Sequence, residues 1–401
     1  MNNFINNLYN KNYMQILEGM GITSVSGIYC LGENIGIKSA KKDFAVIYSE
    51  RLANAVGVFT KNEIKGAPVI VSTKKLKSGK AQAIIINSGI SNVCTGEQGI
   101  KDAVETARLG GEELGIPEEY VLVSSTGLIG AYLPMDKIRV GIKGIKDRLS
   151  KNSMAPAEAI LTTDTKLKQI AIRIDKVTIA GIAKGAGMIN PNMATMLVFI
   201  MSDAEIDSKY LGKMLKNSVD KSFNMITIDN DTSTSDSVFL FANGIAGKIS
   251  YSKFQEGLDF VCKELAKLIA RDGEGATKLI EVIVKNARTE TQAKKIAKSI
   301  AGSNLFKSAM FGSDPNWGRI MSAVGYSYTN ITQNSIDVYI NKDKIVSGGV
   351  GVNFDREKIS NLLKSDKVQI TVDLHLGIKS AVAYGCDLTY DYVKINAQYH
   401  T

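Results

Sequence analysis

The stretch from Ala183 to Ser202, AKGAGMINPNMATMLVFIMS, joins an irregular loop to a strand of the core. Its first half contains two glycines and the pair Asn190-Pro191, which disfavour the interior of a regular element. Its second half, Met196 to Met201, is a near-continuous apolar run, short enough for a strand that is buried on both faces. The stretch therefore places Thr195 where a glycine-bearing loop meets the first residue of a rigid core strand.

Thr195 is a candidate nucleophile because the chain offers few conventional bases. The sequence has two histidines, His375 and His400, both near the C-terminus. A hydroxyl needs an adjacent base, which can be histidine, lysine or the nucleophile's own terminal amine. Cleavage between Ala194 and Thr195 would free an amine with a reference pKa of about 7.7–8.0, close to the working pH. The structural alternative is a β-branched residue that simply opens a strand.

The composition is that of an ordinary globular protein. The 401 residues are 44% hydrophobic and 22% charged, enough material for two or more subdomains. The net charge of +9 is spread over many segments, without a run of five or six basic residues. Aromatic residues make up only 7%. This pattern argues against nucleic-acid binding and favours an anionic small substrate or solubility as the reason for the charge.

The cysteines and the hydropathy pattern predict a cytoplasmic protein. The four cysteines are far apart and show no CxxC pairing, and Cys262 falls at a helical apolar position of a core. The N-terminal residues lack the pattern of a signal peptide. Both features favour a reducing compartment. No window of 18 uninterrupted apolar residues occurs, so we expect neither a membrane span nor a membrane partner.

Strands and helices alternate along the chain, with hairpins among them, which predicts an α+β fold. A hairpin is expected about Asp175-Lys176. Short apolar runs predict early strands over Phe44–Ile47, Ala55–Phe59, Val69–Val71 and Ala83–Ile86. A first helix is expected to bury Ile100, Val104, Ala107 and Leu114. A long later helix is expected to bury Phe254, Leu258, Val261, Leu265, Leu268 and Ile269. Thr289 and Gln292 predict a capping box.

Several polar segments could take part in chemistry, and each has a plain structural alternative. The segment NSGISNVCTGEQG from Asn87 could present backbone N–H groups to an anion or merely connect a strand to a helix. The segment SSTGLIG from Ser124 has the composition of an ordinary turn. The segment AILTTDT offers Thr162, Thr163 and Thr165, any of which could contact a substrate. Glu274, in DGEGATK, is flanked by two glycines that leave its carboxylate accessible.

Nine segments in a fixed order together resemble the ornithine acetyltransferase (glutamate N-acetyltransferase, ArgJ) family of arginine biosynthesis. They cover nearly all of the chain from about Gly21 onward. The segments are GVFTKNEIKGAPV, NSGISNVCTGEQG, SSTGLIG, AILTTDT, KGAGMINPNMATMLVFI, DTSTSDS, DGEGATK, DPNWGR and the tail INAQYHT. The chain departs from the family pattern at Ile90, where relatives usually have asparagine, and at Asn230, where they usually have glycine. Asparagine tolerates a positive φ, so the turn at Asn230 can survive.

The resemblance implies a layered αββα-like sandwich of the ArgJ/DmpA type with a smaller second subdomain. It also implies that the precursor cuts itself between Ala194 and Thr195. The products would be an α chain of residues 1–194 and a β chain of residues 195–401. The two chains would stay interlocked, with two copies of each in the assembly.

The resemblance further implies acetyl transfer from N2-acetyl-L-ornithine to L-glutamate, with acetyl-CoA as an additional donor left open. Thr195 would be the nucleophile, and Thr126 and Gly127 would form the oxyanion hole. No metal and no cofactor are expected. The implied substrate contacts are Thr163, Lys184, Thr195, Glu274, Asn396 and Thr401.

Two other functions remain open from the residues alone. The first is an amidohydrolase or aminopeptidase built on the same kind of N-terminal nucleophile, in which water takes the acyl group. The second is a non-enzymatic assembly protein, in which Thr195 would stay uncut and replaceable. Denaturing electrophoresis separates the second from an enzyme, because a cut chain gives two fragments of roughly equal size.

Overall fold

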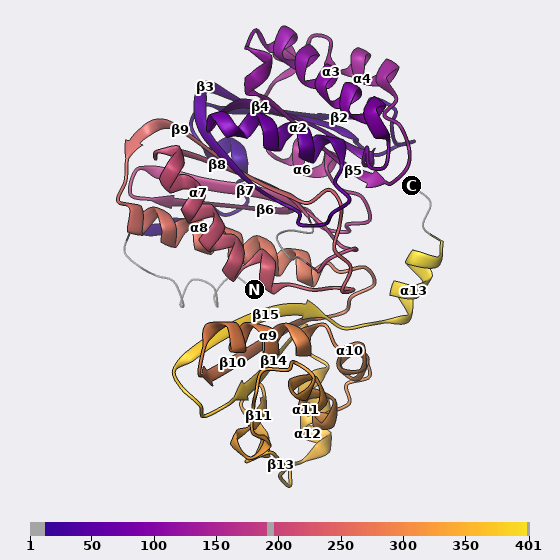
Figure 1. The fold of residues 1–401 in the computed structure, drawn as a ribbon, viewed down its shortest axis with the longest axis vertical. Coiled ribbons are helices and arrows are strands. Elements are labelled where there is room, and N and C mark those ends of the chain that lie inside the picture. Colours follow the sequence, from indigo (N-terminus) through magenta and orange to yellow (C-terminus); the bar gives the residue numbers. More distant parts are fainter. Residues whose placement is uncertain (1–12, 191–195, 399–401) are drawn as a thin grey trace.

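The computed structural model of the protein describes residues 13–190 and 196–398. It shows a large layered lobe with a smaller lobe beneath it (Figure 1). Over the described residues, no helix combines the length and the apolar character that a membrane crossing would require.

One sheet supplies both inner layers of the large lobe. Within the described chain it has nine strands in the order β1-β6-β7-β8-β9-β3-β4-β5, with β2 paired to β3. The first strands are β1 (Met14–Ile16), β2 (Ile28–Glu33), β3 (Phe44–Phe59), β4 (Lys80–Ile90) and β5 (Val121–Leu128). The others are β6 (Lys168–Ile174), β7 (Val177–Lys184), β8 (Leu197–Glu205) and β9 (Ser237–Lys248).

The long strand β3 joins the two layers because it belongs to both. Residues 44–48 and 53–54 pair with β4, with a register shift between Tyr48 and Ala53, and residues 54–59 pair with β9. The two strands expected from the sequence in this region are therefore one bent strand. The layers enclose an apolar core in which the rings of Phe199 and Phe239 stack at 5.6 Å.

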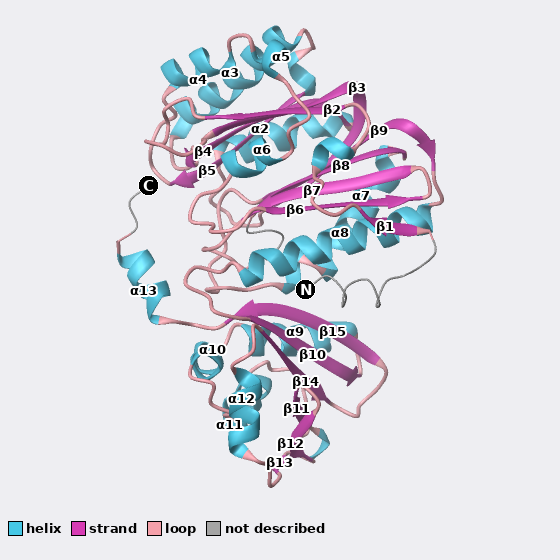
Figure 2. Ribbon diagram, turned by 180° about the vertical axis from the view of Figure 1, so that it is seen from behind, coloured by secondary structure: helices cyan, strands magenta, loops and turns pink. Residues whose placement is uncertain are grey.

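Helices cover both outer faces of the sandwich (Figures 1 and 2). One face packs against α2 (Ala67–Lys75), α3 (Gly96–Leu114), α4 (Met135–Ile142) and α5 (Ile145–Arg148). The opposite face packs against α7 (Ser208–Lys221) and α8 (Tyr251–Arg271). The short helix α6 (Met154–Ala159) contributes to the core between the layers.

The smaller lobe is a second sheet with its own helices. Among the described residues this sheet has six strands in the order β13-β12-β11-β14-β10-β15. They are β10 (Leu279–Ala287), β11 (Asp337–Ile340), β12 (Asp343–Ser347), β13 (Val350–Gly351), β14 (Lys367–Asp373) and β15 (Lys379–Cys386). Its helices are α9 (Glu290–Ala301), α10 (Asn304–Phe311), α11 (Trp317–Gly325) and α12 (Arg356–Leu363). Helix α13 (Tyr390–Ala397) then returns along the side of the molecule towards the large lobe.

The expectation of an α+β fold, an αββα-like sandwich with a smaller second lobe, is confirmed. The hairpin about Asp175 is also confirmed, with a φ of 50° at that residue. Asn230 has a φ of 67°, as its turn requires. Cys262 is fully buried, as expected.

Four local expectations are wrong. Residues 69–71 lie in helix α2, because Pro68 in its first turn favours a helix start over a strand. The segment from Ser124 is not a turn but part of strand β5. Val104 and Leu268 are 42% and 38% exposed, so the apolar stripes of α3 and α8 are narrower than their sequences indicate.

The capping box at the start of α9 is only half formed. The side chain of Thr289 accepts a hydrogen bond from the backbone N–H of Gln292, at 3.1 Å. The side-chain oxygen of Gln292 accepts from the backbone N–H of Arg288, at 2.9 Å, rather than from that of Thr289.

Candidate active site

Six of the predicted site residues line one cavity of about 310 Å³. They come from segments that are far apart in the sequence, and they are Thr126, Gly127, Thr163, Lys184, Glu274 and Asn396. Ala194, Thr195 and Thr401, the other residues expected at the site, lie outside the described residues. The structure thus brings the described candidates together, and their individual roles remain predictions.

Strands β4 and β5 place Thr126 and Gly127 at the cavity. The two strands run parallel, with Ser88 opposite Thr126 and Gly89 opposite Gly127. Gly127 has a φ of +128°, and a Cβ added there would lie 2.2 Å from the carbonyl carbon of Gly89. Only glycine therefore permits this approach of the strand ends. It also leaves the backbone N–H of Gly127 unshielded by a side chain.

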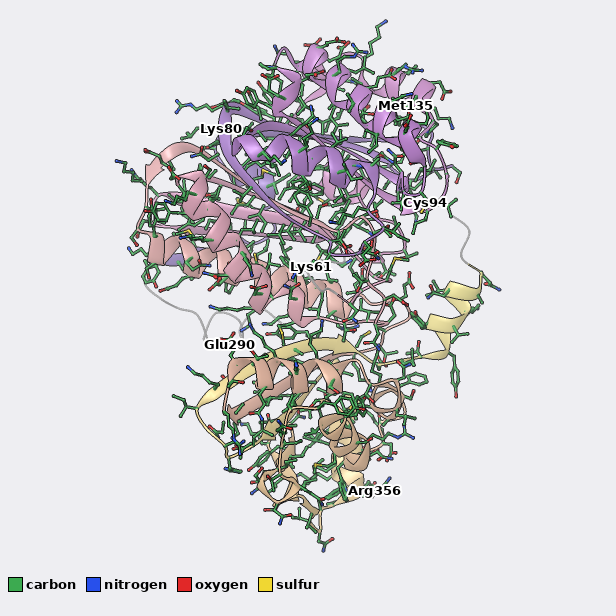
Figure 3. All side chains as sticks on the ribbon, in the orientation of Figure 1. Lys61, Lys80, Cys94, Met135, Glu290 and Arg356 are labelled. Atoms are coloured by element: carbon green, nitrogen blue, oxygen red, sulfur yellow. The ribbon has the colours of Figure 1, made fainter. Side chains whose placement is uncertain are left out.

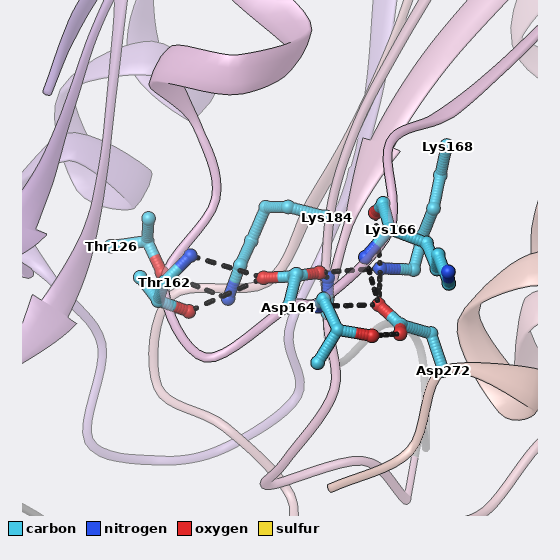
Figure 4. Close-up of polar contacts among 9 residues, drawn as sticks. Thr126, Thr162, Asp164, Lys166, Lys168, Lys184 and Asp272 are labelled. Atoms are coloured by element: carbon cyan, nitrogen blue, oxygen red, sulfur yellow. Dashed lines mark hydrogen bonds and ion pairs between the residues drawn. The ribbon is translucent and has the colours of Figure 1, made fainter. Parts of the chain in front are cut away.

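Lys184 stands at the end of β7 and is only 8% exposed. Its Nζ donates a hydrogen bond to Oγ1 of Thr126 at 3.4 Å (Figure 4). Burial lowers the pKa of the Lys184 ammonium below its ordinary value, while the negative charge of Asp164 opposes that shift. Lys184 is therefore a buried cation whose charge depends on the acidic groups around it.

Glu274 is held by contacts on both sides of the cavity. Its backbone N–H donates to the carbonyl oxygen of Ala186 at 2.9 Å. Its carboxylate accepts a hydrogen bond from Nδ2 of Asn396 at 2.7 Å. A Cβ on residue 187 would lie 2.5 Å from that carboxylate, so the absence of a side chain at Gly187 leaves room for Glu274.

Helix α13 brings Asn396 to the cavity with little support from packing. No residue of this described helix is buried, and its apolar Ile395 is only partly covered. The hydroxyl of Thr389 donates to the carbonyl oxygen of Gly275 at 2.8 Å. Together with the contact between Asn396 and Glu274, this bond fastens the helix to the glycine-flanked loop.

The described residues on either side of positions 191–195 lie next to residues that line the same cavity. Lys184 lies opposite Leu197 in the antiparallel pair of β7 and β8, and Leu197 is two positions after Thr195. The backbone N–H of Ser237 donates to the carbonyl oxygen of Met196 at 2.9 Å, which fixes the first described residue after the gap. The loop before the gap is also held, because Asp229 accepts from the backbone N–H groups of Met188 and Ile189 at 2.6 and 2.7 Å.

Sequence reasoning missed two sets of residues at this site. The first set completes the cavity wall and includes Ser91, Leu128, Ile129, Met188, Ser233, Thr234 and Ser235. All seven lie in segments that belong to the family resemblance, which was the signal for them. The second set is a buried ion-pair cluster of Asp164, Lys168 and Asp272, which lies next to the cavity residue Lys184 (Figure 4). The spacing of four residues between Asp164 and Lys168 was its only local signal.

A second cavity, of about 410 Å³, lies between α7, α8 and the smaller lobe. Glu290, at the start of α9, lies on its wall at the boundary between the lobes (Figure 3). None of the predicted site residues within the described ranges lines it. Over residues 13–190 and 196–398, no cluster of three or more His, Cys, Asp or Glu side chains is arranged to hold a metal ion.

Comparison with known proteins matches almost the whole chain to one family. The profile of the ArgJ family matches residues 29–401. The arginine biosynthesis bifunctional protein ArgJ of Caldanaerobacter subterraneus subsp. tengcongensis is 48% identical over 404 residues, which cover 97% of this chain and 100% of that protein. The protein of the same name from Staphylococcus aureus (strain COL) is 49% identical over 399 residues, which cover 96% of this chain and 97% of the relative.

A solved structure agrees with these matches. The crystal structure of the arginine biosynthesis bifunctional protein argJ from Bacillus halodurans is 45% identical, with a TM-score of 0.50. The match covers 51% of this chain and 100% of that chain. On the evidence of the family profile and of relatives matched over nearly their full length, the chain belongs to the ArgJ family.

Proposed function

We propose that this protein moves the acetyl group of N2-acetyl-L-ornithine to L-glutamate through an acetyl ester on Thr195. Its family carries out acetyl transfer in arginine biosynthesis, and the protein is an enzyme of that kind. One observation carries the assignment of substrates and residues. A buried cation, a carboxylate and a candidate oxyanion hole, contributed by distant segments, line a single cavity.

The charges of the cavity suit the common part of both substrates. Each is an amino acid with an α-carboxylate, which the ammonium of Lys184 can hold. The carboxylate of Glu274, with Asn396 beside it, can receive an α-amino group or the terminal amine of Thr195. A cavity of about 310 Å³ has room for one such molecule at a time. Donor and acceptor would therefore use the site in turn.

The reaction requires a free amine on Thr195, which self-cleavage supplies. The hydroxyl oxygen of Thr195 attacks the carbonyl carbon of Ala194, the C–N bond breaks, and an ester replaces the peptide bond. Water then hydrolyses the ester, leaving a carboxylate on Ala194 and an amine on Thr195. These steps need no group beyond the chain and water.

In the first half of the transfer, the hydroxyl of Thr195 attacks the acetyl carbonyl of N2-acetylornithine and gives its proton to the terminal amine. The N–H of Gly127 and the hydroxyl of Thr126 donate to the oxyanion that develops. Thr126 can donate because its oxygen already accepts from Lys184, which leaves the hydroxyl hydrogen available. The C–N bond then breaks, the leaving nitrogen takes the proton, and ornithine departs.

In the second half, the α-amine of glutamate attacks the acetyl ester. The amine of Thr195 takes the proton from the attacking nitrogen, the same donors hold the oxyanion, and the C–O bond breaks. The hydroxyl of Thr195 regains its proton. N-acetylglutamate leaves, and the enzyme returns to its starting state.

We further propose that residues 1–194 and 195–401 form two interlocked chains. The cut would fall between the neighbouring antiparallel strands β7 and β8, so both products would share one sheet. A solved chain that corresponds in full to 51% of this one supports such a division. An assembly with two copies of each chain, in the cytoplasm, without a metal or cofactor, completes the proposal. Whether acetyl-CoA is a second donor is tested in the assay described next.

The direct test uses N2-acetylornithine labelled in the acetyl group. Incubation with glutamate should give labelled N-acetylglutamate, and unlabelled ornithine should exchange into the donor when glutamate is absent. Release of free acetate at the same rate without glutamate would identify a hydrolase instead. A parallel reaction with labelled acetyl-CoA measures the second donor. The absence of product from either donor in the cleaved protein would contradict acetyl transfer.

A further inference from the structure

Lys168 is fully buried and bonded to three acceptors. Its Nζ donates to Oδ1 of Asp164 at 2.7 Å and to Oδ2 of Asp272 at 2.5 Å. It also donates to the backbone carbonyl oxygen of Lys166 at 3.3 Å. Figure 4 shows this cluster beside Lys184 and Thr126, with Asp164 between Lys184 and Lys168. An ammonium buried so completely costs folding free energy unless every donor is satisfied, so its position calls for a function.

Asp164 connects Lys168 to two walls of the cavity. Its Oδ1 accepts a hydrogen bond from the backbone N–H of Gly185, next to Lys184, at 2.6 Å. Its Oδ2 accepts from the backbone N–H of Thr162 at 3.0 Å. Burial alone would raise the pKa of Asp164, but the charges of Lys168 and Lys184 hold it well below its usual range. Asp164 is therefore a fixed anion that fastens the end of β7.

Asp272 connects Lys168 to the loop that carries the cavity residue Glu274. Its Oδ2 accepts from the backbone N–H groups of Thr165 and Lys166 at 3.1 and 3.2 Å, and its Oδ1 accepts from the hydroxyl of Thr165. Asp272 ends helix α8 and is two residues before Glu274. The N–H of Glu274 bonds in turn to Ala186, two residues after Lys184. The contacts thus close a ring around the back of the cavity.

We propose that Asp164, Lys168 and Asp272 form a positioning clamp that sets the separation of Lys184 and Glu274 for an amino-acid substrate. The clamp rests on the proposed function, because it assumes that those two residues hold the substrate. Asp164 and Lys168 precede the expected cut and Asp272 follows it. The clamp therefore also ties the two expected chains together at the cavity. None of its three side chains lines the cavity, so none is a catalytic residue.

The central variant is Lys168→Met, which removes the ammonium and keeps the length of the side chain. Lys168→Arg tests for rescue by a retained charge. A triple variant, Lys168→Met with Asp164→Asn and Asp272→Asn, avoids leaving buried carboxylates uncompensated and protects against simple failure to fold. All variants are compared in the form in which the protein is purified, with thermal unfolding recorded for each.

Two lysines provide matched controls. Lys278 is also buried, and its Nζ donates to the carbonyl oxygens of Met310 and Leu363 in the smaller lobe at 2.9 and 2.8 Å. Lys278→Met should therefore lower thermal stability without changing substrate binding. Lys253 pairs with Asp175 at 2.8 Å across the expected division of the chain, away from the cavity. Lys253→Met tests whether the loss of any ion pair between residues 1–194 and 195–401 weakens substrate binding as Lys168→Met is expected to do.

The readout separates positioning from stability. We expect Lys168→Met and the triple variant to lose about 10²-fold in kcat/KM, mainly through higher KM for both substrates. Lys168→Arg should recover part of this loss, and both control variants should keep the parent KM. A folded Lys168→Met with unchanged KM would overturn the clamp. If Lys278→Met lost as much kcat/KM as Lys168→Met for the same loss of thermal stability, the clamp would also be overturned.

Calorimetric titration with L-ornithine and with L-glutamate keeps the two proposals distinguishable, because binding does not require acetyl transfer. If the parent binds these amino acids without transferring acetyl, the proposed reaction fails while weaker binding to Lys168→Met still supports the clamp. If the parent transfers acetyl and all variants bind as it does, the clamp alone fails. If the parent binds neither amino acid, both proposals are overturned.

Discussion

Lys184 donates a hydrogen bond to the hydroxyl of Thr126 across 3.4 Å, which links the buried cation of the cavity to one of the two proposed oxyanion donors. The two residues come from β7 and β5, strands that are not neighbours in the sheet. This hydrogen bond orients the hydroxyl of Thr126, and no basic acceptor is needed to do so. It therefore connects the residue that would hold a substrate carboxylate to the residue that would stabilise the transition state.

Replacing Thr126 by alanine should lower kcat by about 10²–10³-fold in both half-reactions, because each passes through an oxyanion at the same place. Thr126→Ser keeps the hydroxyl and should retain most of the activity. The measurement is the rate of ornithine exchange and of acetyl transfer to glutamate, each by itself. Unchanged rates in Thr126→Ala would remove Thr126 from the mechanism.

The affinity for glutamate should fall at alkaline pH as Lys184 loses its proton. A lysine holds a carboxylate only while it is protonated, so affinity is complete below its pKa and is lost as the pH rises through it. Burial lowers this pKa, so the loss begins below the range of an ordinary lysine. The charged groups that act on Lys184 are Lys38, Asp164, Lys168, Asp236 and Glu274.

The sign can be checked with Asp164→Asn. Asp164 raises the pKa of Lys184, so its neutralisation should move the loss of affinity to lower pH. Lys168 has the opposite effect on that pKa, and Lys168→Met should move the loss to higher pH. Calorimetric binding of glutamate between neutral and alkaline pH measures both shifts. Shifts in the same direction for both variants would contradict this role for Lys184.

Gly127→Ala should destabilise the protein and abolish transfer. The new Cβ would lie 2.2 Å from the backbone of Gly89, a clash between strand ends that flexible side chains cannot relieve. Gly130 is the control, because it also has a positive φ, of +87°, but open space where its Cβ would be. Gly130→Ala should cost about 1–2 kcal/mol from the backbone conformation alone. In chemical denaturation, Gly127→Ala should lower the free energy of unfolding by about 1–3 kcal/mol more than Gly130→Ala does. Equal losses in the two variants would refute the close approach of Gly127 to Gly89.

Asn396→Ala should weaken substrate binding, because the carboxylate of Glu274 loses the donor that orients it in the cavity. The variant removes a hydrogen bond to the carboxylate of Glu274, worth about 1.5–3 kcal/mol. That loss corresponds to roughly 10- to 100-fold in KM. Val393, on the same helix and 63% exposed, is the control, and Val393→Ala should behave as the parent. If the two variants gave the same KM, Asn396 would have no role at the site.

The sequence predicted the layered α+β fold, but local patterns failed where tertiary packing decides. Residues 69–71 are β-branched and apolar, which favours a strand, yet they lie in a helix that begins at Ala67 and has Pro68 in its first turn. The strands expected at 44–47 and 55–59 were separated because the exposed residues between them look like a turn. The exposed residues lie at the bend of β3, where this one strand passes from one layer of the sandwich to the other.

The cavity residues were predictable because family motifs carry them, whereas the buried cluster behind them was not. Lys168 opens a strand, where a lysine is ordinarily assigned to the surface. Its burial depends on Asp272, which lies 104 residues further along the chain. Residue type and spacing contain no information on such a pairing. The motif DGEGATK predicts Glu274 as a site residue but contains no signal for the ion pair of Asp272, its first residue.

The central claim is that Thr195 becomes the first residue of its own chain and supplies both hydroxyl and base. Mass spectrometry of the active protein tests it most directly. The account predicts two fragments, residues 1–194 and 195–401, with a free amine on Thr195, and an uncut, inactive chain for Thr195→Ala. Full activity in a single intact chain of 43.4 kDa would contradict it.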